Sequence, residues 1–360
     1  MSPYNFAVIA GDGIGPEVTR EALKVLHRVS RIYGFKYVTT DYPFGSEHYL
    51  ACGELMPDTV YDEYRQHDAI FLGAIGDPRV EVGLVERAVI AGVRFNLDLY
   101  INLRPIKLYA ESLCPLKDKR CEDIDMYVVR ENTEDAYTGL GGIMKKGTPD
   151  EVAIANMVFT RKGCERATRY AFELAEARNK DKKVTLVDKA NAIRAQDIWT
   201  RTVDEVGLEY PDISHDHAYI DAACMWLVKN PEWFDVVVTT NLFGDIFTDL
   251  GAMLQGGMGI AASGNIHPGQ VSMFEPIHGS APKYKGKNVA CPIAAIMAVQ
   301  IMLDYIGEQG AADAIESAVA SLLQTGKIGS LDARSGIGTD KMGDMVVEEL
   351  ESANNARLKV

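Results

Sequence analysis

Two aspartates, Asp245 and Asp249, lie four residues apart in TTNLFGDIFTD, directly after the β-branched run FDVVV. On a helix this spacing places both carboxylates on one face, where like charges repel by a few tenths of a kcal/mol. Asp221 adds a third carboxylate within the apolar stretch YIDAACMWL, where an isolated charge would be costly to bury. Three carboxylates with water and substrate oxygens predict a site for Mg²⁺ or Mn²⁺. The alternative makes Asp245 and Asp249 a helix cap and a solvated side chain.

Three arginines provide the opposite charge. Arg94 and Arg104 lie ten residues apart in GVRFNLDLYINLRP, and Arg130 ends the strand-like run MYVVR. Each arginine alone would be interpreted as part of a surface ion pair, but three of them near strand or turn ends indicate a shared binding role. Because a guanidinium group binds a carboxylate through two parallel hydrogen bonds, they predict a small substrate with more than one carboxylate.

Two further side chains are candidates for proton transfer. Lys189 follows the strand VTLVD and would enter the crevice at the end of the sheet, where a nearby divalent cation would favour its neutral amine and make it a base. The alternative is an ion pair with Asp188. Tyr137 in RENTEDAY is a candidate proton donor, although a tyrosine of this kind more often serves packing.

Two glycine-containing segments are candidate cofactor loops. GDGIGPE follows a strand and opens a helix, but its G-x-G-x-G spacing differs from the Rossmann fingerprint, so a plain tight turn remains equally open. EPIHGSAPKYKGKNVACP, from Glu275 to Pro292, is a polar loop whose backbone N–H groups would suit dinucleotide phosphates.

The elements that must position these residues alternate between strand and helix. A first strand at YNFAVIA, a helix with Pro16 at its start and a strand at DAIFLGAIG indicate a largely parallel sheet covered by helices. Gly139–Thr160 predicts an extended hairpin or arm, a helix follows at Arg161–Arg178, and Leu254–Gly269 is expected to be a loop or hinge. The middle of the chain would form a part inserted between the two ends.

Composition excludes several function classes. With 360 residues, 47% of them apolar and a net charge of −14, the chain lacks the basic excess that a nucleic-acid binder needs. No stretch is long and apolar enough to predict a membrane partner, and MSPYNFAVIA lacks the basic region of a signal peptide. Six scattered cysteines without metal-ligand spacing predict free thiols and a cytoplasmic location.

Taken together, NLRP, VVRENTEDAY, VDKAN, YIDAACMWL, NLFGDIFTD and FEPIHGSAP resemble the β-decarboxylating dehydrogenases, the isopropylmalate/isocitrate dehydrogenase family. The resemblance runs from GDGIGPE to near the C-terminus. It implies an α/β protein of two domains that share a twisted mixed sheet, without a Rossmann fold. The large domain would combine residues 1–99 and 256–360, and the small domain residues 100–255. The protein would be a homodimer, with Gly139–Thr160 as its dimerisation arm.

The resemblance also implies roles. Arg94, Arg104 and Arg130 would hold the carboxylates of a dicarboxylate substrate. Asp245 and Asp249 would bind the metal with Asp221 of a second subunit. Lys189, also donated across the dimer, would act as base and Tyr137 as acid. NAD or NADP would be held by the loops, with Lys283 and Tyr284 favouring NADP; the residues concerned are Ile14, Glu275, His278, Gly279, Ser280, Ala281, Lys283, Tyr284 and Cys291.

Substrate choice is expected from the segment VERAVIAGVR before Arg94. Ile90 and Val93 favour an apolar substituent, which makes 3-isopropylmalate the preferred substrate among 3-substituted (R)-malates, while the small Ala91 and Gly92 suggest a wider pocket. Arg87 could instead bind a distal carboxylate. Homoisocitrate, isocitrate, D-malate, tartrate and bulkier malates therefore stay open as substrates. A non-catalytic metal- or nucleotide-binding homologue is the alternative of another class.

Overall fold

The computed structural model describes residues 2–357 and divides the chain into two compact units. The first unit comprises Met1–Leu99, Lys107–Ile124 and Ala252–Val360, and the second Tyr100–Ile106 and Asp125–Gly251. The sequence analysis assigns the whole of 100–255 to the small domain. The structure places Lys107–Ile124 with the first unit, because the side chains of Lys107 and Tyr109 both bond to Glu316 there.

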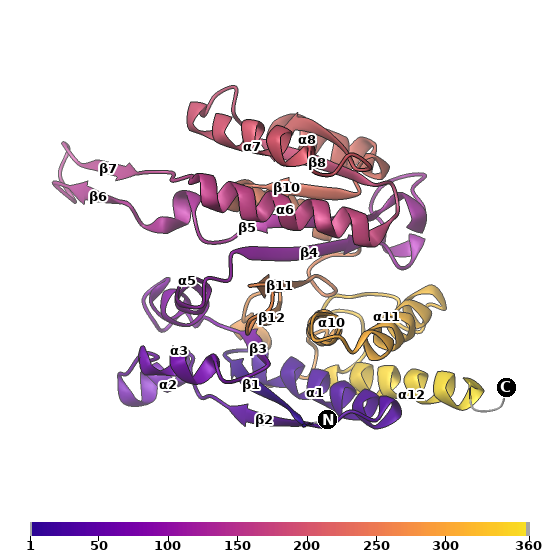
Figure 1. Ribbon diagram of the computed structural model, residues 1–360. Helices are drawn as coiled ribbons and strands as arrows, with labels where there is room; N and C mark the ends of the chain where they lie inside the picture. Colours follow the sequence, from indigo (N-terminus) through magenta and orange to yellow (C-terminus); the bar gives the residue numbers. More distant parts are fainter. Residues whose placement is uncertain (1, 358–360) are drawn as a thin grey trace. The chain divides into compact units, whose positions relative to one another are not determined.

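The first unit has five strands in the order β2-β1-β3-β12-β11 (Figure 1). Neighbouring strands run parallel, except that β11 and β12 are antiparallel. Their bounds are β1 Tyr4–Gly11, β2 Tyr37–Asp41, β3 Ala69–Ala74, β11 Ala262–Ile266 and β12 Met273–Pro276. The strand β11 lies inside the segment expected to be a loop. The expectation was wrong here: the mostly small and polar residues of ASGNI suggested a loop, but all five are buried in a strand.

Helices in this unit follow the apolar spacing of the sequence. In α1 (Gly15–Tyr33), Val18, Ala22, Val25 and Val29 are buried on one face, and the helix ends at Gly34 with φ of 81°. The helix α10 (Ile293–Tyr305) is buried along nearly its whole length. The others are α2 Ser46–Cys52, α3 Thr59–Tyr64, α4 Leu84–Glu86, α5 Gly92–Asn96, α11 Gln309–Gln324 and α12 Thr339–Arg357, with a five-residue π-helix at Arg87–Ala91.

The second unit has strands in the order β4-β5-β10-β8-β9. The neighbouring strands β5, β10, β8 and β9 run parallel. Their carboxyl ends therefore meet at one edge, where candidate side chains follow β5, β8 and β10. The bounds are β4 Ile101–Lys107, β5 Asp125–Glu131, β8 Lys183–Asp188, β9 Ser214–Tyr219 and β10 Val236–Thr239, with helices α6 Arg161–Arg178, α7 Asp197–Gly207, α8 Ile220–Lys229 and α9 Asn241–Leu254.

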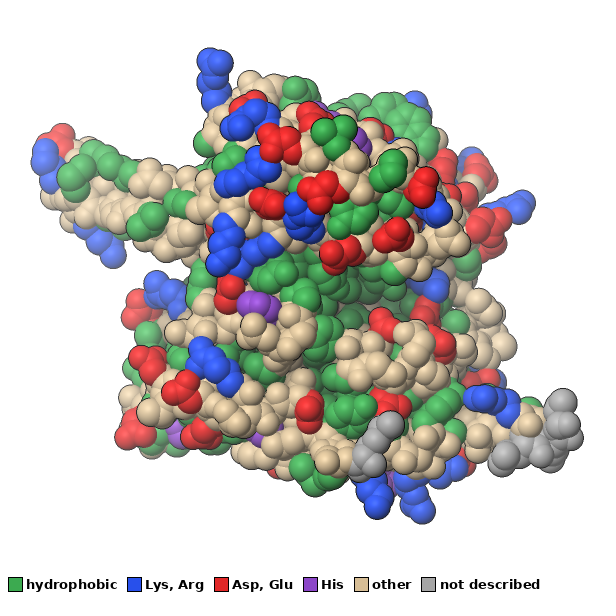
Figure 2. All heavy atoms as spheres, in the orientation of Figure 1, with side chains coloured by type: hydrophobic (Ala, Val, Ile, Leu, Met, Phe, Trp, Pro, Cys, Tyr) green, Lys and Arg blue, Asp and Glu red, His purple; other side chains and the backbone are tan. Residues whose placement is uncertain are grey.

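A two-stranded hairpin extends from the second unit. It consists of β6 (Gly141–Met144) and β7 (Val152–Ala155), which pair antiparallel within the segment predicted to be an arm. Figure 2 shows hydrophobic side chains along it, and those of Leu140, Ile143, Met144, Val152 and Ile154 are exposed. An isolated two-stranded ribbon is marginally stable in water, so an exposed apolar surface on such a ribbon indicates a partner.

Short 3-10 turns connect several elements, at Glu111–Leu113, Cys121–Asp123, Asp135–Thr138, Arg194–Gln196, Pro231–Trp233 and Pro282–Tyr284. Among the described residues, no helix has both the length and the apolar character needed to cross a membrane.

Candidate active site

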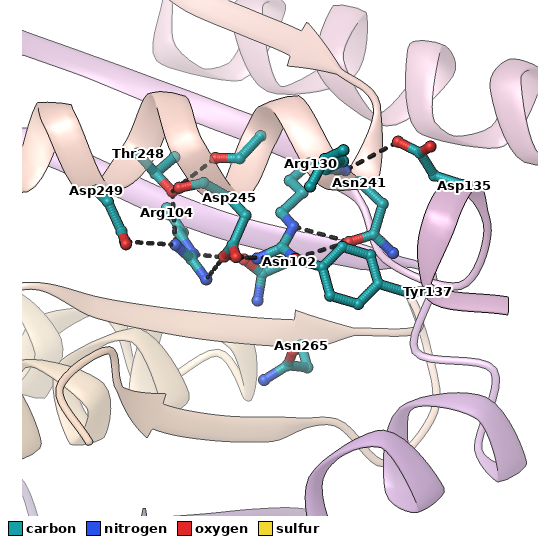
Figure 3. A network of polar contacts seen from close by, with 12 residues as sticks. Asn102, Arg104, Arg130, Asp135, Tyr137, Asn241, Asp245, Thr248, Asp249 and Asn265 are labelled. Atoms are coloured by element: carbon teal, nitrogen blue, oxygen red, sulfur yellow. Dashed lines mark hydrogen bonds and ion pairs between the residues drawn. The ribbon is translucent and has the colours of Figure 1, made fainter. Parts of the chain in front are cut away.

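Arginines and aspartates from three elements of the second unit converge in one polar cluster. The strand β4 contributes Arg104, β5 contributes Arg130, and α9 contributes Asp245 and Asp249 (Figure 3). Both arginines are buried, with exposed fractions of 5% and 1%. A buried charge requires paired and hydrogen-bonded surroundings, and the cluster supplies them.

Arg104 is fixed by neighbours on its own strand and on α9. Its Nε donates to Oδ1 of Asn102 at 2.7 Å, and its Nη1 donates to Oγ1 of Thr248 at 2.6 Å. Asn102 stands two residues earlier on β4, so both side chains point to the same face of the sheet. Neither Asn102 nor Thr248 was predicted, because only the folded chain reveals that they orient the guanidinium group.

Arg130 packs directly against the backbone of α9 at the buried Gly244. A Cβ atom at that position would lie 2.5 Å from Cγ of Arg130, so only glycine leaves room for this side chain. Beyond Gly244, Nε and Nη2 of Arg130 both donate to Oδ1 of Asn241, at 3.0 and 2.7 Å. The first turn of α9 thus determines where this guanidinium group lies.

Asp245 connects the cluster. Its Oδ1 accepts from Nη2 of Arg104 at 3.2 Å and from Nη1 of Arg130, and its Oδ2 accepts from the Tyr137 hydroxyl at 3.0 Å. Arg104 also lies 3.5 Å from Oδ1 of Asp249. Two arginines therefore compensate the repulsion between carboxylates that stand one helical turn apart. Asp249 remains more than half exposed, and partial burial followed by the charge of Asp245 raises its pKa.

Lys189 and Asp221 pair with each other, since Nζ of Lys189 lies 2.5 Å from Oδ1 of Asp221. The alternative partner Asp188 instead contacts His217 at 2.8 Å. The expectation that Asp221 is buried was wrong for the single chain: its side chain is 69% exposed, on the face of α8 where Met225 and Val228 are also exposed. Apolar neighbours in sequence suggested burial, but they lie on an outward-facing surface of this chain.

The carboxylates fit a hard divalent cation only in part. Asp245 and Asp249 offer oxygen ligands of the kind that Mg²⁺ and Mn²⁺ prefer, on one face of α9. Across the described residues, however, no three His, Cys, Asp or Glu side chains gather closely enough to hold a metal ion. Completing such a site therefore requires ligands from a substrate or from a second copy of the chain.

The first unit holds the remaining predicted arginines. Arg94 on α5 pairs with Glu275 at 2.8 Å, and Glu275 also accepts from Asn265 at 2.9 Å. The Nε atom of Arg94 is buried and has no partner among the described residues. An unsatisfied buried donor of this kind suits an anionic ligand.

The predicted specificity segment contains a π-helix at Arg87–Ala91, a form that is frequent at functional sites. Arg87 is exposed and donates to the carbonyl oxygen of Gly83 at 2.9 Å, while Ile90 packs against the apolar core of the unit. A Cβ atom on Gly92 would lie 2.3 Å from the hydroxyl of Tyr61. The small size of Gly92 therefore accommodates Tyr61, which removes one reason to expect a wider substrate pocket.

The two predicted cofactor loops meet within the first unit. The amide of Ile14 donates to the carbonyl oxygen of Ser280 at 2.8 Å, and a Cβ atom on Gly13 would lie 1.9 Å from that oxygen. Asp12, which sequence reasoning missed, is buried and accepts hydrogen bonds from the amides of Ser46, Glu47 and Gly76. The aspartate of GDGIGPE thus joins its own loop to the start of α2 and to the loop after β3, a role visible only in the fold.

Within the second loop, His278 has a ring nitrogen that could bind a ligand. Its Nδ1 lies 3.1 Å from the carbonyl oxygen of Gly279, and its buried Nε2 has no partner among the described residues. Burial lowers the pKa of His278 below its ordinary value, which favours the neutral ring at pH 7. Because a carbonyl can only accept, Nδ1 carries the proton and Nε2 is left as an acceptor, which suits a donor group of a dinucleotide.

The rest of this loop combines a rigid turn with positive charge. Ala281 has φ of 40°, and Nζ of Lys283 lies 4.8 Å from the centre of the Tyr284 ring. Lys285 instead pairs with Glu47. Cys291 is buried, and burial raises the pKa of its thiol to about 12, so this side chain is uncharged at pH 7. Gly279 faces open space, as a contact surface for a ligand would.

An α/β architecture with two buried arginines beside partly exposed carboxylates is typical of an enzyme that acts on a small anion. Comparison with known protein families identifies the kind of enzyme: residues 5–346 match the family model described as isocitrate/isopropylmalate dehydrogenase. The chain belongs to this family, which confirms the resemblance and the fold class. The family uses a nicotinamide cofactor and a divalent metal.

Individual relatives agree with this assignment. A protein of Thermobifida fusca named 3-isopropylmalate dehydrogenase is 51% identical over 338 residues, covering 93% of this chain and 95% of that protein. One of Corynebacterium glutamicum with the same name is 48% identical over 350 residues, covering 96% and 99%. The solved isocitrate dehydrogenase of Methylococcus capsulatus has a TM-score of 0.86 and 37% identity, covering 96% of this chain and 99% of that chain.

Proposed function

We propose that this chain catalyses the metal- and NAD(P)⁺-dependent oxidative decarboxylation of 3-isopropylmalate to 4-methyl-2-oxopentanoate, a step of leucine biosynthesis. The names of relatives at about 50% identity over almost the whole chain support this substrate. The observation that carries the chemistry is the cluster in which Asp245 joins Arg104, Arg130 and Tyr137. The reaction oxidises the C2 hydroxyl to a ketone, releases the carboxylate on C3 as CO₂ and protonates C3.

In this proposal the arginines bind the malate carboxylates. Arg104 and Arg130 are held rigidly by Asn102, Thr248 and Asn241, so they lose little freedom when an anion binds. Arg94 offers its unsatisfied Nε to the same substrate. Such fixed guanidinium groups orient the bond that breaks and favour one geometry of the reacting carbons.

Asp245 and Asp249, with Asp221 from a second copy of the chain, would hold Mg²⁺ or Mn²⁺. When bound there, the cation stabilises the negative charge that develops on substrate oxygen as CO₂ leaves. Lys189, which pairs with Asp221 in the single chain, would accept the proton of the C2 hydroxyl.

Tyr137 would donate the proton that C3 receives. Its hydroxyl donates to Asp245 at 3.0 Å, which holds the phenol within the cluster of arginines and carboxylates. The guanidinium carbon of Arg130 lies 5.4 Å from the centre of the Tyr137 ring. This cation–π contact adds a second restraint on the position of the ring that would donate the proton.

For the cofactor we infer NAD or NADP held by Ile14 and the loop from Glu275 to Cys291, with Lys283 and Tyr284 favouring NADP. The neutral His278 ring supports this placement because its Nε2 can accept from a nucleotide amino or hydroxyl group. A lysine at position 283 adds attraction for a 2′-phosphate.

The active sites would be shared across a homodimer. Two apolar surfaces of the second unit support this: the β6–β7 hairpin, and the face of α8 and α9 that exposes Met225, Val228, Ile246 and Met253. Two copies of the chain would bury these surfaces against each other, with Gly139–Thr160 as the dimerisation arm. We also infer a cytoplasmic location, which the six free cysteines support.

The alternative substrate is a malate with an acidic 3-substituent, such as homoisocitrate, and the observation that favours it is the exposed Arg87. Initial-rate kinetics on 3-isopropylmalate, homoisocitrate, isocitrate, D-malate and tartrate, each with NAD or NADP and Mn²⁺, test the proposal. We expect the highest kcat/KM with 3-isopropylmalate. Faster turnover of homoisocitrate would reassign the substrate, and no cofactor reduction with any malate would support a non-catalytic homologue.

A further inference from the structure

We propose that Asp135 is a positioning residue that fixes Tyr137 against the first turn of α9. Asp135 is 1% exposed, lies two residues before Tyr137 and opens the 3-10 turn Asp135–Thr138. Its role rests on the proposed function, because it would act through the tyrosine assigned to proton transfer. No residue type in RENTEDAY suggested it, since only the folded chain brings it to α9.

The backbone of Asp135 adopts an unfavourable conformation. Its φ is 68°, in the left-handed region that residues with a Cβ atom rarely occupy and that glycine adopts freely. Its amide donates to the carbonyl oxygen of Val158 at 2.8 Å, which anchors the turn. If conformation alone mattered, glycine would be the better residue here. The side chain of Asp135 must therefore compensate for the strain.

That side chain joins the turn to α9. Its Oδ2 accepts from the amide of Leu242 at 2.9 Å, a contact drawn in Figure 3, and its Oδ1 accepts from the amide of Ala136 at 2.8 Å. Leu242 is the second residue of α9, so its N–H has no acceptor within the helix. A carboxylate at a helix N-terminus also interacts favourably with the helix dipole.

The contacts that Asp135 and Tyr137 make with α9 lie close together. Asp135 binds the amide of Leu242, and Tyr137 binds the carboxylate of Asp245 three residues further along the same helix. Without the first contact, the segment would still be joined to α9 by the Tyr137–Asp245 bond and by Nδ2 of Asn241, which donates to the carbonyl oxygen of Glu134 at 3.2 Å. The backbone at Asp135 and Ala136 would then have no bond to the helix through the Asp135 carboxylate, and the Tyr137 ring would sample other positions. The tyrosine would remain present but would spend less time where it can protonate substrate.

The test is a double-mutant cycle between Asp135→Gly and Tyr137→Phe, measured as kcat and KM for the preferred malate. Because Asp135→Gly relieves the strained φ, we expect a folded protein whose kcat falls ~10- to 100-fold with a smaller change in KM, as a misplaced catalytic group would cause. The double variant should be no slower than Tyr137→Phe alone. Asp135→Asn, which keeps an acceptor oxygen, should recover most of kcat.

A second readout needs no turnover. Hydrogen–deuterium exchange of the peptide containing Leu242 should accelerate in Asp135→Gly and remain slow in Asp135→Asn. Asp118→Gly is the matched control, because Asp118 is exposed and has φ of 59°; its kcat should equal that of the parent protein. An unchanged kcat in Asp135→Gly would overturn the role of Asp135. So would a double variant whose loss of kcat equals the product of the losses in the two single variants. A fully active Tyr137→Phe would instead contradict the proposed function of the tyrosine.

Discussion

Arg94 and Glu275 form an ion pair in the first unit, with Nη2 of the guanidinium group 2.8 Å from Oε1 of the carboxylate. The sequence assigned these residues to different ligands, Arg94 to the substrate and Glu275 to the cofactor. Glu275 stands on β12, where the loop expected to bind the dinucleotide begins. If both proposed roles hold, binding of one ligand would affect binding of the other through this pair.

Replacing Glu275 by Gln should weaken substrate binding more than it slows turnover. The amide keeps the shape and the contact with Asn265 but loses the charge that orients Arg94. We expect KM for the malate to rise about tenfold, corresponding to ~1.4 kcal/mol, with kcat changed less. Initial-rate kinetics measure both constants. An unchanged KM would show that Arg94 is oriented without Glu275.

Asp245→Asn should abolish metal-dependent turnover, by at least ~100-fold, while the protein stays folded. The substitution removes the charge that Arg104, Arg130 and the cation would share. Turnover with Mn²⁺ and calorimetric titration of Mn²⁺ measure the effect, and addition of EDTA to the parent protein should produce the same loss. Retained activity in the variant would exclude Asp245 as a metal ligand.

Mixed dimers test whether active sites are shared between subunits. Lys189→Ala and Asp245→Asn should each be inactive as homodimers. If one site combines Asp245 of one copy with Lys189 of the other, a mixed dimer contains one intact site. Random reassociation of equal amounts would then restore about a quarter of parental activity. No recovery, in dimers shown by mass spectrometry to have exchanged subunits, would place both residues in a site of one chain.

The pair of His217 and Asp188 should make stability depend on pH. The hydrogen bond that the His217 ring donates to the buried Asp188 carboxylate raises the pKa of His217, and the charges of Asp204 and Asp216 act in the same direction. Since the folded state binds the proton more tightly, this stabilisation is complete below the unfolded pKa of about 6.5 and is lost as pH rises through the folded value. Denaturation in urea from pH 6 to 9 should show the decline. His217→Asn should flatten it.

Cofactor choice can be tested at Lys283 and Tyr284. Converting the pair to Asp and Ile removes the positive charge and adds a carboxylate suited to ribose hydroxyls. We expect kcat/KM with NADP to fall at least ~10-fold relative to NAD, because the new charge repels a 2′-phosphate. Lys285→Ala serves as a control, because Lys285 already pairs with Glu47. An unchanged preference would place the adenosine ribose elsewhere.

Elements with strong local signals could be predicted from the sequence. The helix Arg161–Arg178 begins and ends where expected, since Thr160 caps its start by accepting from the amide of Gly163 and Asn179 ends it with φ of 48°. The arm was recognised as a hairpin from its glycines and short apolar runs. The spacing of Asp245 and Asp249 on one helix face was likewise a local property.

Long-range contacts could not be predicted in the same way. The clusters around Asp12 and Asp135 depend on loops that are distant in sequence, and the apolar sequence around Asp221 did not reveal that it lies on an exposed face. The buried strand β11 was mistaken for a loop because burial there comes from its neighbours and not from its own composition. The missed residues mostly hold other residues in place.

Gly244 carries a consequence for sequence variation. It offers no functional group, yet any side chain at this position would meet Arg130, with the first added carbon 2.5 Å from Cγ. A screen that scores residues by their chemistry would treat a change to alanine here as conservative. We expect such variants to be recovered as loss-of-function alleles, because the added carbon would displace Arg130.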